Sequence, residues 1–308
     1  NRISVRKCND YDLHEVYSLI SDIYESSGGP DPKGLRVLLK PNILLDVEPS
    51  KCVTTHPVIV EAMVRYMQTR GASAVLVGDS PSVHNKGFTP EKSGIMDVCR
   101  RTGAEWVDFR DRWCEIRMRK ASIRVASAAV EAGLVVSLPK FKNHELVYLT
   151  GAIKNTLGVV PGFIKGKQHA LYQSRNSFGE FLVDLNEALL PHYFLMDGIM
   201  AMEGPGPGQG LPRKAGVLIG SANPLLVDIT ASKIAGYEPM LIPTNRVAFF
   251  RRKWMQGEDD IQYDGPDTDS LRISNWVRIP VSSNSNISLQ FVMRRIKPLR
   301  KLERRPVF

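Results

Sequence analysis

Short apolar runs alternate with amphipathic stretches along most of the chain. Apolar runs that end at proline, glycine or a polar side chain predict buried strands, here at residues 3–5, 36–40, 73–77, 105–109, 134–138, 193–196 and 216–220. Apolar positions spaced three or four residues apart predict helices between them, at residues 12–24, 58–67, 95–102, 126–132, 150–157, 178–190 and 225–235. Strands that alternate with helices predict an α/β fold with a mostly parallel, helix-covered sheet.

The pattern also suggests how the chain is divided. Residues 1–145 form a first α/β lobe in this interpretation, and residues 146–240 form a second α/β portion that closes a cleft between two lobes. Residues 241–308 are a mixed C-terminal region with a basic tail, in which 270–281 and 287–293 could be edge strands. The glycine- and proline-rich segment 203–211 is expected to be irregular.

Polar residues collect directly after the predicted strands. In open α/β sheets, ligands bind beyond the carboxyl ends of the strands. The residues expected at these ends are Lys40-Pro41-Asn42, Gly78-Asp79-Ser80, Lys140 to His144, Asp197-Gly198 and Gly220-Ser221. One edge of the sheet would then hold lysine, asparagine, aspartate, serine and histidine side chains together.

The strongest local signal is the series Lys140, Lys142 and His144. Alternate residues of an extended segment point the same way, so three groups that can be cationic share one side. An anionic ligand would relieve their repulsion. The segment 151–158 adds Lys154 and Asn155 between glycines, which permit close approach of the backbone to a ligand.

Three further features are weaker candidates. His169 lies in an expected loop, 165–169, behind two lysines. Glu203, Gly204, Gly206 and Gly208 belong to a segment without the Gly-Lys-Ser/Thr ending of a P-loop, which we interpret as a lid or a backbone nest. His56 stands at a helix start, where backbone N–H groups can bind an anion.

Each of these motifs also has a structural interpretation. Lys-Pro-Asn and Gly-Asp-Ser-Pro are ordinary turn sequences. Lys154 could point outward from a plain short helix, and His169 could be an exposed loop residue. Asp184 and Asp228 fall within predicted helices, where capping or surface pairing is the default role for a carboxylate.

Charge is concentrated near the end of the sequence. Residues 294–305 contain seven basic residues and one acidic residue, so they supply six of the nine net positive charges. We expect a solvated extension there; contact with nucleic acid or an anionic membrane surface is the alternative. No nucleic-acid-binding motif accompanies the tail. No apolar run is long enough for a membrane span, and the first residues lack the apolar core of a signal peptide.

The four cysteines, Cys8, Cys52, Cys99 and Cys114, include no Cys-x-x-Cys pair. This spacing excludes the usual zinc ribbon and the ferredoxin ligand run. We therefore expect reduced thiols in a cytoplasmic protein and no iron–sulfur cluster. A divalent metal stays open, with Asp79 and Glu203 as its candidate ligands.

The motifs together resemble an uncharacterised family, domain of unknown function 362. The resemblance covers about residues 3–237 and rests on Leu39-Lys40-Pro41-Asn42, Thr54-Thr55-His56-Pro57, Val77 to Pro81, Pro139 to His144, Thr150 to Gly158, Asp197-Gly198-Ile199 and Met202 to Pro207. Many members carry a ferredoxin-type module, which this chain lacks. A more distant similarity to the lactate racemase fold, in the Gly-Asp strand ends and the Lys/His complement, is an analogy of fold.

The sequence thus predicts an enzyme that acts on a small anionic metabolite, a carboxylate or a phosphate. Lys40, Asn42, His56, Ser80, Lys140, Lys142 and Asn155 would bind the anion, and His144, His169, Lys154 and Asp79 are the catalytic candidates. Isomerase, lyase and oxidoreductase chemistry all stay open. The alternatives are a non-enzymatic partner or maturation factor in a redox system, and a protein that binds nucleic acid or an anionic surface through its tail.

Overall fold

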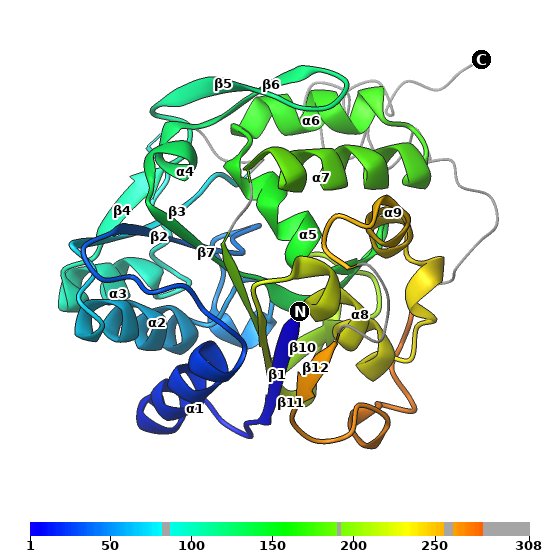
Figure 1. Cartoon of the computed structure of the whole chain (residues 1–308), viewed down its shortest axis with the longest axis horizontal. Helices are drawn as coiled ribbons and strands as arrows, with labels where there is room; N and C mark the ends of the chain where they lie inside the picture. Colours follow the sequence, from blue (N-terminus) through cyan, green and yellow to red (C-terminus); the bar gives the residue numbers. More distant parts are fainter. Residues whose placement is uncertain (82–86, 190–191, 256–260, 280–308) are drawn as a thin grey trace, which may run out of the picture.

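The fold is described from a computed structural model, which covers residues 1–81, 87–189, 192–255 and 261–279, without the side chains of Phe163 and His169 (Figure 1). The strands of the main sheet are β1 (Arg2–Lys7), β2 (Arg36–Pro41), β3 (Ala74–Asp79), β4 (Glu105–Asp108), β7 (Leu134–Leu138), β8 (Lys140–His144), β9 (Tyr148–Thr150), β10 (Tyr193–Glu203), β11 (Leu211–Ser221) and β12 (Gln262–Asp264). Strands β5 (Trp113–Arg117) and β6 (Ser122–Ala126) form a separate hairpin.

Helices connect these strands. The described helices are α1 (Leu13–Ser26), α2 (Pro57–Thr69), α3 (Ile95–Thr102), α4 (Ser127–Glu131), α5 (Ala152–Asn155), α6 (Gly162–Leu171), α7 (Arg175–Leu189), α8 (Pro224–Ile234) and α9 (Pro243–Arg251). Short 3₁₀ turns lie at η1 (Pro49–Lys51), η2 (Thr156–Val159), η3 (Pro239–Leu241) and η5 (Asp269–Leu271). The α/β class predicted from the sequence is therefore confirmed.

The sheet is mostly parallel, with strand order β12-β1-β11-β10-β7-β2-β3-β4. Strand β11 runs antiparallel to both of its neighbours, β1 and β10. Strand β8 continues from β7, pairs parallel with β10, and carries β9 antiparallel on its other side. The N-terminal strand β1 thus lies between two strands from the last third of the chain.

Helices cover both faces of the sheet (Figure 1). Helices α1, α2 and α3 pack on one face, where alternate β2 residues Val37 and Leu39 join their core. Helices α7, α8 and α9 lie on the other face, and Leu38 joins the core there. Burial on both faces explains why the parallel strands are apolar at every position instead of at alternate ones.

Polar side chains cap the first turns of three of the described helices. Asp12 accepts a hydrogen bond from the backbone N–H of Glu15, and Asn223 caps α8 ahead of Pro224 in the same way. His56 caps helix α2 in the same manner, and its imidazole nitrogen accepts from the Val58 N–H at 3.3 Å.

Three expectations about elements are wrong. Asp197-Gly198 does not end a strand, because β10 continues to Glu203 through its pairing with β11. Residues 165–169 belong to helix α6, which begins after Pro161, and not to a loop. Residues 270–279 contain no strand but only the turn η5. The expected strand 287–293 and the basic tail lie outside the described residues.

The expected boundary after residue 145 falls between two strands that pair with each other, β8 and β9. Strand β10, from the second portion, pairs with β7 and β8 of the first. The described parts of both portions therefore contribute to one sheet. The division into lobes stays a prediction. Within the described residues, no helix has the length and apolar character needed to cross a lipid bilayer.

Candidate functional site

A small cavity of about 60 Å³ lies beyond the carboxyl ends of β2 and β3. It is lined by Lys40, Asn42, Ile43, Leu44, Asp79, Ser80, Pro81, Lys142, His144, Lys154, Asn155, Leu157, Gly158, Lys165 and Pro207. Eight of the residues expected at a site are in this lining. They come from separate segments, which the parallel order of the strands brings to one edge of the sheet.

Lys40 and Asp79 form a buried ion pair in the lining of the cavity. The Lys40 Nζ atom lies 3.2 Å from Asp79 Oδ1, and both side chains are at most 3% exposed. Burial lowers the pKa of Lys40, and the charge of Asp79 acts against that shift. Asp79 also accepts hydrogen bonds from the backbone N–H groups of Ile43 and Ser80. This carboxylate is therefore held by one cation and two amides.

Asn155 connects the cavity to the strand ends. Its side-chain oxygen accepts from Lys40 Nζ at 3.3 Å and from Asn42 Nδ2 at 3.0 Å. Its side-chain nitrogen donates to the Lys40 carbonyl and to Ser137 Oγ. The amide is thereby fixed between β2, β7 and α5, and it orients the end of the Lys40 side chain.

Two buried polar atoms of the lining have no hydrogen-bond partner in the described part of the protein. They are Asn42 Oδ1 and Ser80 Oγ. Asn42 is 9% exposed and Ser80 is fully buried. A buried polar atom without a partner is unfavourable by about 1–3 kcal/mol, so these two atoms are ready to contact a bound molecule.

Lys142, His144 and Lys154 complete the polar lining. Lys142 is buried, and its Nζ atom donates to the backbone carbonyl of Val53. The His144 Nδ1 atom accepts from the Leu146 N–H at 3.2 Å, so a neutral His144 carries its proton on Nε2. Lys154 is half-buried at the end of α5.

Lys165 is a cavity residue that the sequence interpretation did not select. It enters from helix α6, is 7% exposed, and donates to the backbone carbonyl of Ser80. Burial lowers the pKa of Lys165 to about 7; Asp79 acts against this shift, while Lys40 and Arg110 add to it. The segment 165–169 was identified as basic, but nothing in its sequence indicates that this side chain turns inward.

Gly158 gives the ion pair its space. A Cβ atom at this position would overlap the Nζ and Cε atoms of Lys40 and the carboxylate of Asp79. Only glycine fits here without moving the pair. The glycine that the sequence marked as a neighbour of Lys154 and Asn155 thus lets η2 approach the cavity closely.

Asp228 positions the segment that carries Lys154 and Asn155. This α8 residue is buried, and its carboxyl group accepts from the backbone N–H groups of Ala152 and Ile153 at 2.5 and 3.2 Å. Burial raises the pKa of Asp228 to about 7, although both hydrogen bonds act in the opposite direction. Its role is that of a cap, supplied to α5 by another helix.

Lys140 and His56, both expected to bind the anion, lie in a different buried cluster around Asp197. The Asp197 carboxylate pairs with Lys140 Nζ at 2.7 Å and accepts from the Tyr11 hydroxyl and the His56 N–H. The His56 ring stacks on Tyr11, with centroids 3.5 Å apart. Burial lowers the pKa of His56 to about 4. The anion at this helix start is therefore an internal carboxylate.

The glycine-rich segment joins β10 to β11, and only part of it reaches the cavity. Glu203 lies 3.5 Å from Arg213 and accepts from the Val277 N–H. Gly204 and Gly206 make backbone hydrogen bonds with Val277 and Glu145, and a Cβ atom at Gly208 would contact Leu44. Pro207 is the one residue of this segment that lines the cavity.

His169, the two candidate metal ligands and the four cysteines are the remaining residues that the sequence suggested. His169 lies in helix α6, but its side chain is outside the described residues. Asp79 and Glu203 hold separate basic partners, Lys40 and Arg213, and do not meet at the cavity. Among the described residues, no group of three or more His, Cys, Asp or Glu side chains could hold a metal ion. All four cysteines are free, and Cys114 alone among them is not buried.

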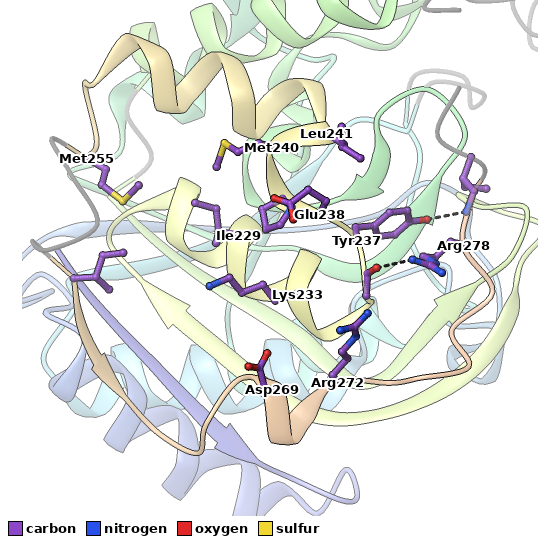
Figure 2. A pocket seen from close by; sticks show the side chains of 14 residues that line it. Ile229, Lys233, Tyr237, Glu238, Met240, Leu241, Met255, Asp269, Arg272 and Arg278 are labelled. Carbon is purple, nitrogen blue, oxygen red and sulfur yellow. Dashed lines mark hydrogen bonds between the residues drawn. The ribbon is translucent and has the colours of Figure 1, made fainter. Parts of the chain in front are cut away.

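A larger cavity of about 890 Å³ lies elsewhere, beside α8, η3 and η5 (Figure 2). Its charged lining residues have both signs, Lys233, Arg272 and Arg278 against Glu238 and Asp269, and all are exposed. Arg278 donates to the Gly236 carbonyl. Because the buried charges and the unpartnered atoms are at the smaller cavity, we take that one as the candidate site.

The sequence matches known proteins over most of its length. A curated relative, described as a thylakoid-associated protein of Synechocystis sp., is 32% identical over 247 residues, which cover 79% of this chain and 77% of the relative.

Among solved structures, the lactate racemase apoprotein of Thermoanaerobacterium thermosaccharolyticum matches with a TM-score of 0.49 at 13% identity, over 75% of this chain and 56% of that chain. A Thermotoga maritima protein matches with a TM-score of 0.45 at 12% identity, over 68% and 55%. The matched region thus spans little more than half the length of either solved chain.

A family model described as domain of unknown function, DUF362, matches residues 37–233. This region contains β2, β3, β8, α5 and α6, the elements that carry the polar side chains of the cavity. The family suggested by the strand-end motifs is confirmed, and this chain belongs to DUF362.

Proposed function

We propose that this chain is an enzyme that acts on a small carboxylate or phosphate anion in the cavity at the ends of β2 and β3. The observation that supports it most is the excess of basic side chains in the lining, where Lys40, Lys142 and Lys154 share one carboxylate, Asp79. A buried charge is stable only when it is paired and hydrogen-bonded. A bound anion would supply the negative charge that this lining lacks.

Each part of the lining has a role in this proposal. Lys40 and Lys154 hold the anion or polarise a carbonyl group, and Asn155 keeps Lys40 in place. The unpartnered Ser80 hydroxyl can donate to the anion, and the unpartnered Asn42 Oδ1 can accept from a hydroxyl group of the bound molecule. Since Nδ1 of His144 accepts a backbone hydrogen bond, its Nε2–H is the acid that can exchange a proton with a substrate.

The proposal predicts that small anions stabilise the protein. Binding to the folded state alone adds about 2.7 kcal/mol to the unfolding free energy at a ligand concentration of a hundred times Kd. Sulfate, phosphate and malonate should therefore raise the Tm by several degrees and in a saturable manner, measured by differential scanning fluorimetry at constant ionic strength. Sodium chloride at matched ionic strength controls for general salt effects.

Two lysine variants show at which of the two cavities the anion binds. Lys154→Ala should lose most of the anion-dependent rise in Tm, because this side chain lines the small cavity. Lys233→Ala, at the larger cavity, should keep the full response. If Lys154→Ala responds like the parent, or if Lys233→Ala loses the response, the anion binds elsewhere and the proposal fails.

A further inference from the structure

Lys165 differs from the other buried lysine of the cavity, Lys40, in its partners. Lys40 has Asp79 as a counter-ion, whereas Lys165 forms no ion pair with any described residue and donates to the neutral carbonyl of Ser80. Asp79 is already engaged by Lys40, Ile43 and Ser80. The positive charges of Lys40 and Arg110 lie close enough to act on Lys165.

These surroundings favour the uncharged amine of Lys165. Burial disfavours an ammonium ion without a counter-ion, and nearby cations disfavour it further. Burial is the largest effect, and together with the two cations it lowers the pKa of this group to about 7, although Asp79 and Asp108 act in the opposite direction. A lysine that is neutral near pH 7 has a free lone pair on Nζ and is a nucleophile toward carbonyl carbon.

We propose that Lys165 is the nucleophile of this site, and that its Nζ atom forms a protonated imine with the carbonyl group of a short oxo acid. This inference rests on the proposed function, whose anion it identifies as a carboxylate that also bears an aldehyde or ketone. A cavity of about 60 Å³ has room for only a few non-hydrogen atoms, which suits a compound of two or three carbons.

Formation of the imine from the Lys165 amine and a carbonyl compound needs no cofactor. The Nζ lone pair bonds to the carbonyl carbon, the C=O π bond breaks, and a proton passes from nitrogen to oxygen to give a neutral carbinolamine, whose hydroxyl group then takes up one proton from the solvent. The C–O bond then breaks and water leaves, while nitrogen and carbon form a double bond. In sum, one amine, one carbonyl compound and one proton from the solvent give one protonated imine and one water.

Reductive trapping tests this assignment on the native protein. Glyoxylate with sodium cyanoborohydride converts an imine into a stable carboxymethyl-lysine, which peptide mass spectrometry locates. We expect Lys165 to be modified at least tenfold faster than Lys167, an exposed lysine of the same helix. Acetaldehyde, which lacks the carboxylate, should give a much smaller preference, and sulfate should slow modification of Lys165 by glyoxylate.

The variants and controls separate the two proposals. Lys165→Met should remove the fast modification, and Lys167→Met should leave it unchanged. If Lys165 of the native protein reacts no faster than Lys167, the imine proposal is wrong, even where sulfate still raises the Tm. If sulfate, phosphate and malonate leave the Tm unchanged, the proposed anion site itself fails. Peptide mapping of the native protein decides the matter even if Lys165→Met does not fold.

Discussion

Asp228 shows how a single buried carboxyl group can make folding depend on pH. It lies inside the protein between α8 and the start of α5, and burial raises its pKa to about 7. In the unfolded chain the same group has a pKa of about 3.9. The folded state therefore binds this proton more tightly than the unfolded chain does. The contribution of Asp228 to the unfolding free energy is complete below about pH 4 and decreases as the pH rises above that value.

This linkage predicts a loss of stability as the pH rises. Between about pH 4 and pH 7 the Asp228 contribution should decrease by up to about 1.4 kcal/mol per pH unit, and it should stay level above that range. The measurement is urea unfolding of the parent and of Asp228→Asn across this range. The parent should lose stability relative to the variant as the pH rises; parallel curves for the two proteins would contradict the assignment.

Individual side chains show where inference from sequence stops. Lys40, Asp79 and Asn155 could be expected at one place, because each follows or faces a strand end that proline, glycine or a turn sequence marks. Lys165 could not, since the rotation of α6 about its axis depends on tertiary packing. The same limit applies to Asp228, whose helix pattern does not show that it caps another helix.

Strand β10 could be predicted only in part. Its apolar start, 193–196, is visible in the sequence, but the polar pair Asp197-Gly198 suggests an end. The strand continues because β8 and β11 pair with it and because Lys140, Tyr11 and His56 satisfy the Asp197 carboxylate. Pairing from distant segments, which no local pattern reveals, thus decided both the length of β10 and the location of Lys140.

The Asp197 cluster should therefore stabilise the fold and not bind a ligand. Asp197→Ala leaves Lys140 as a buried charge without its carboxylate, and such a loss is unfavourable by about 3–5 kcal/mol. Chemical denaturation should show this decrease in the unfolding free energy. The double variant Asp197→Leu with Lys140→Met should recover much of it, because an apolar pair replaces a buried ion pair at little net change.

An anion titration distinguishes this structural role of Lys140 from the anion-binding role that the sequence suggested. The double variant should still show the sulfate-dependent rise in Tm, since neither residue lines the cavity. Retention of the full stability in Asp197→Ala, or loss of the sulfate response in the folded double variant, would contradict the structural role.

At the scale of the whole molecule, the sheet reaches beyond the region that defines the family. The family match covers residues 37–233, yet β1 pairs with β11, and β12 pairs with β1. Helix α1, which also precedes the match, buries Val16, Ile20 and Ile23 against the sheet. Residues 37–233 alone would expose the edge of β11 and the apolar face that α1 covers.

Expression of residues 37–233 tests this dependence. We expect the fragment to unfold without a sharp transition in urea and to bind hydrophobic dyes, because it lacks β1 and α1. The chain without residues 1–27 is the matched comparison, since it keeps β12 but loses the strand between β12 and β11. A cooperative transition in either protein, with a midpoint like that of the parent, would show that β1 is dispensable.

The position of β1 also sets the order of events during translation. Residues that pair in this sheet are far apart in sequence, as Ser4 and Asp264 are, with a separation of 260 positions. A ribosome adds about 5–20 residues per second, so the first strand waits on the order of tens of seconds for its partners. During that interval Ile3 and Val5, fully packed in the finished protein, are exposed. Strand β1 is therefore a segment that a chaperone would cover until β11 and β12 have been synthesised.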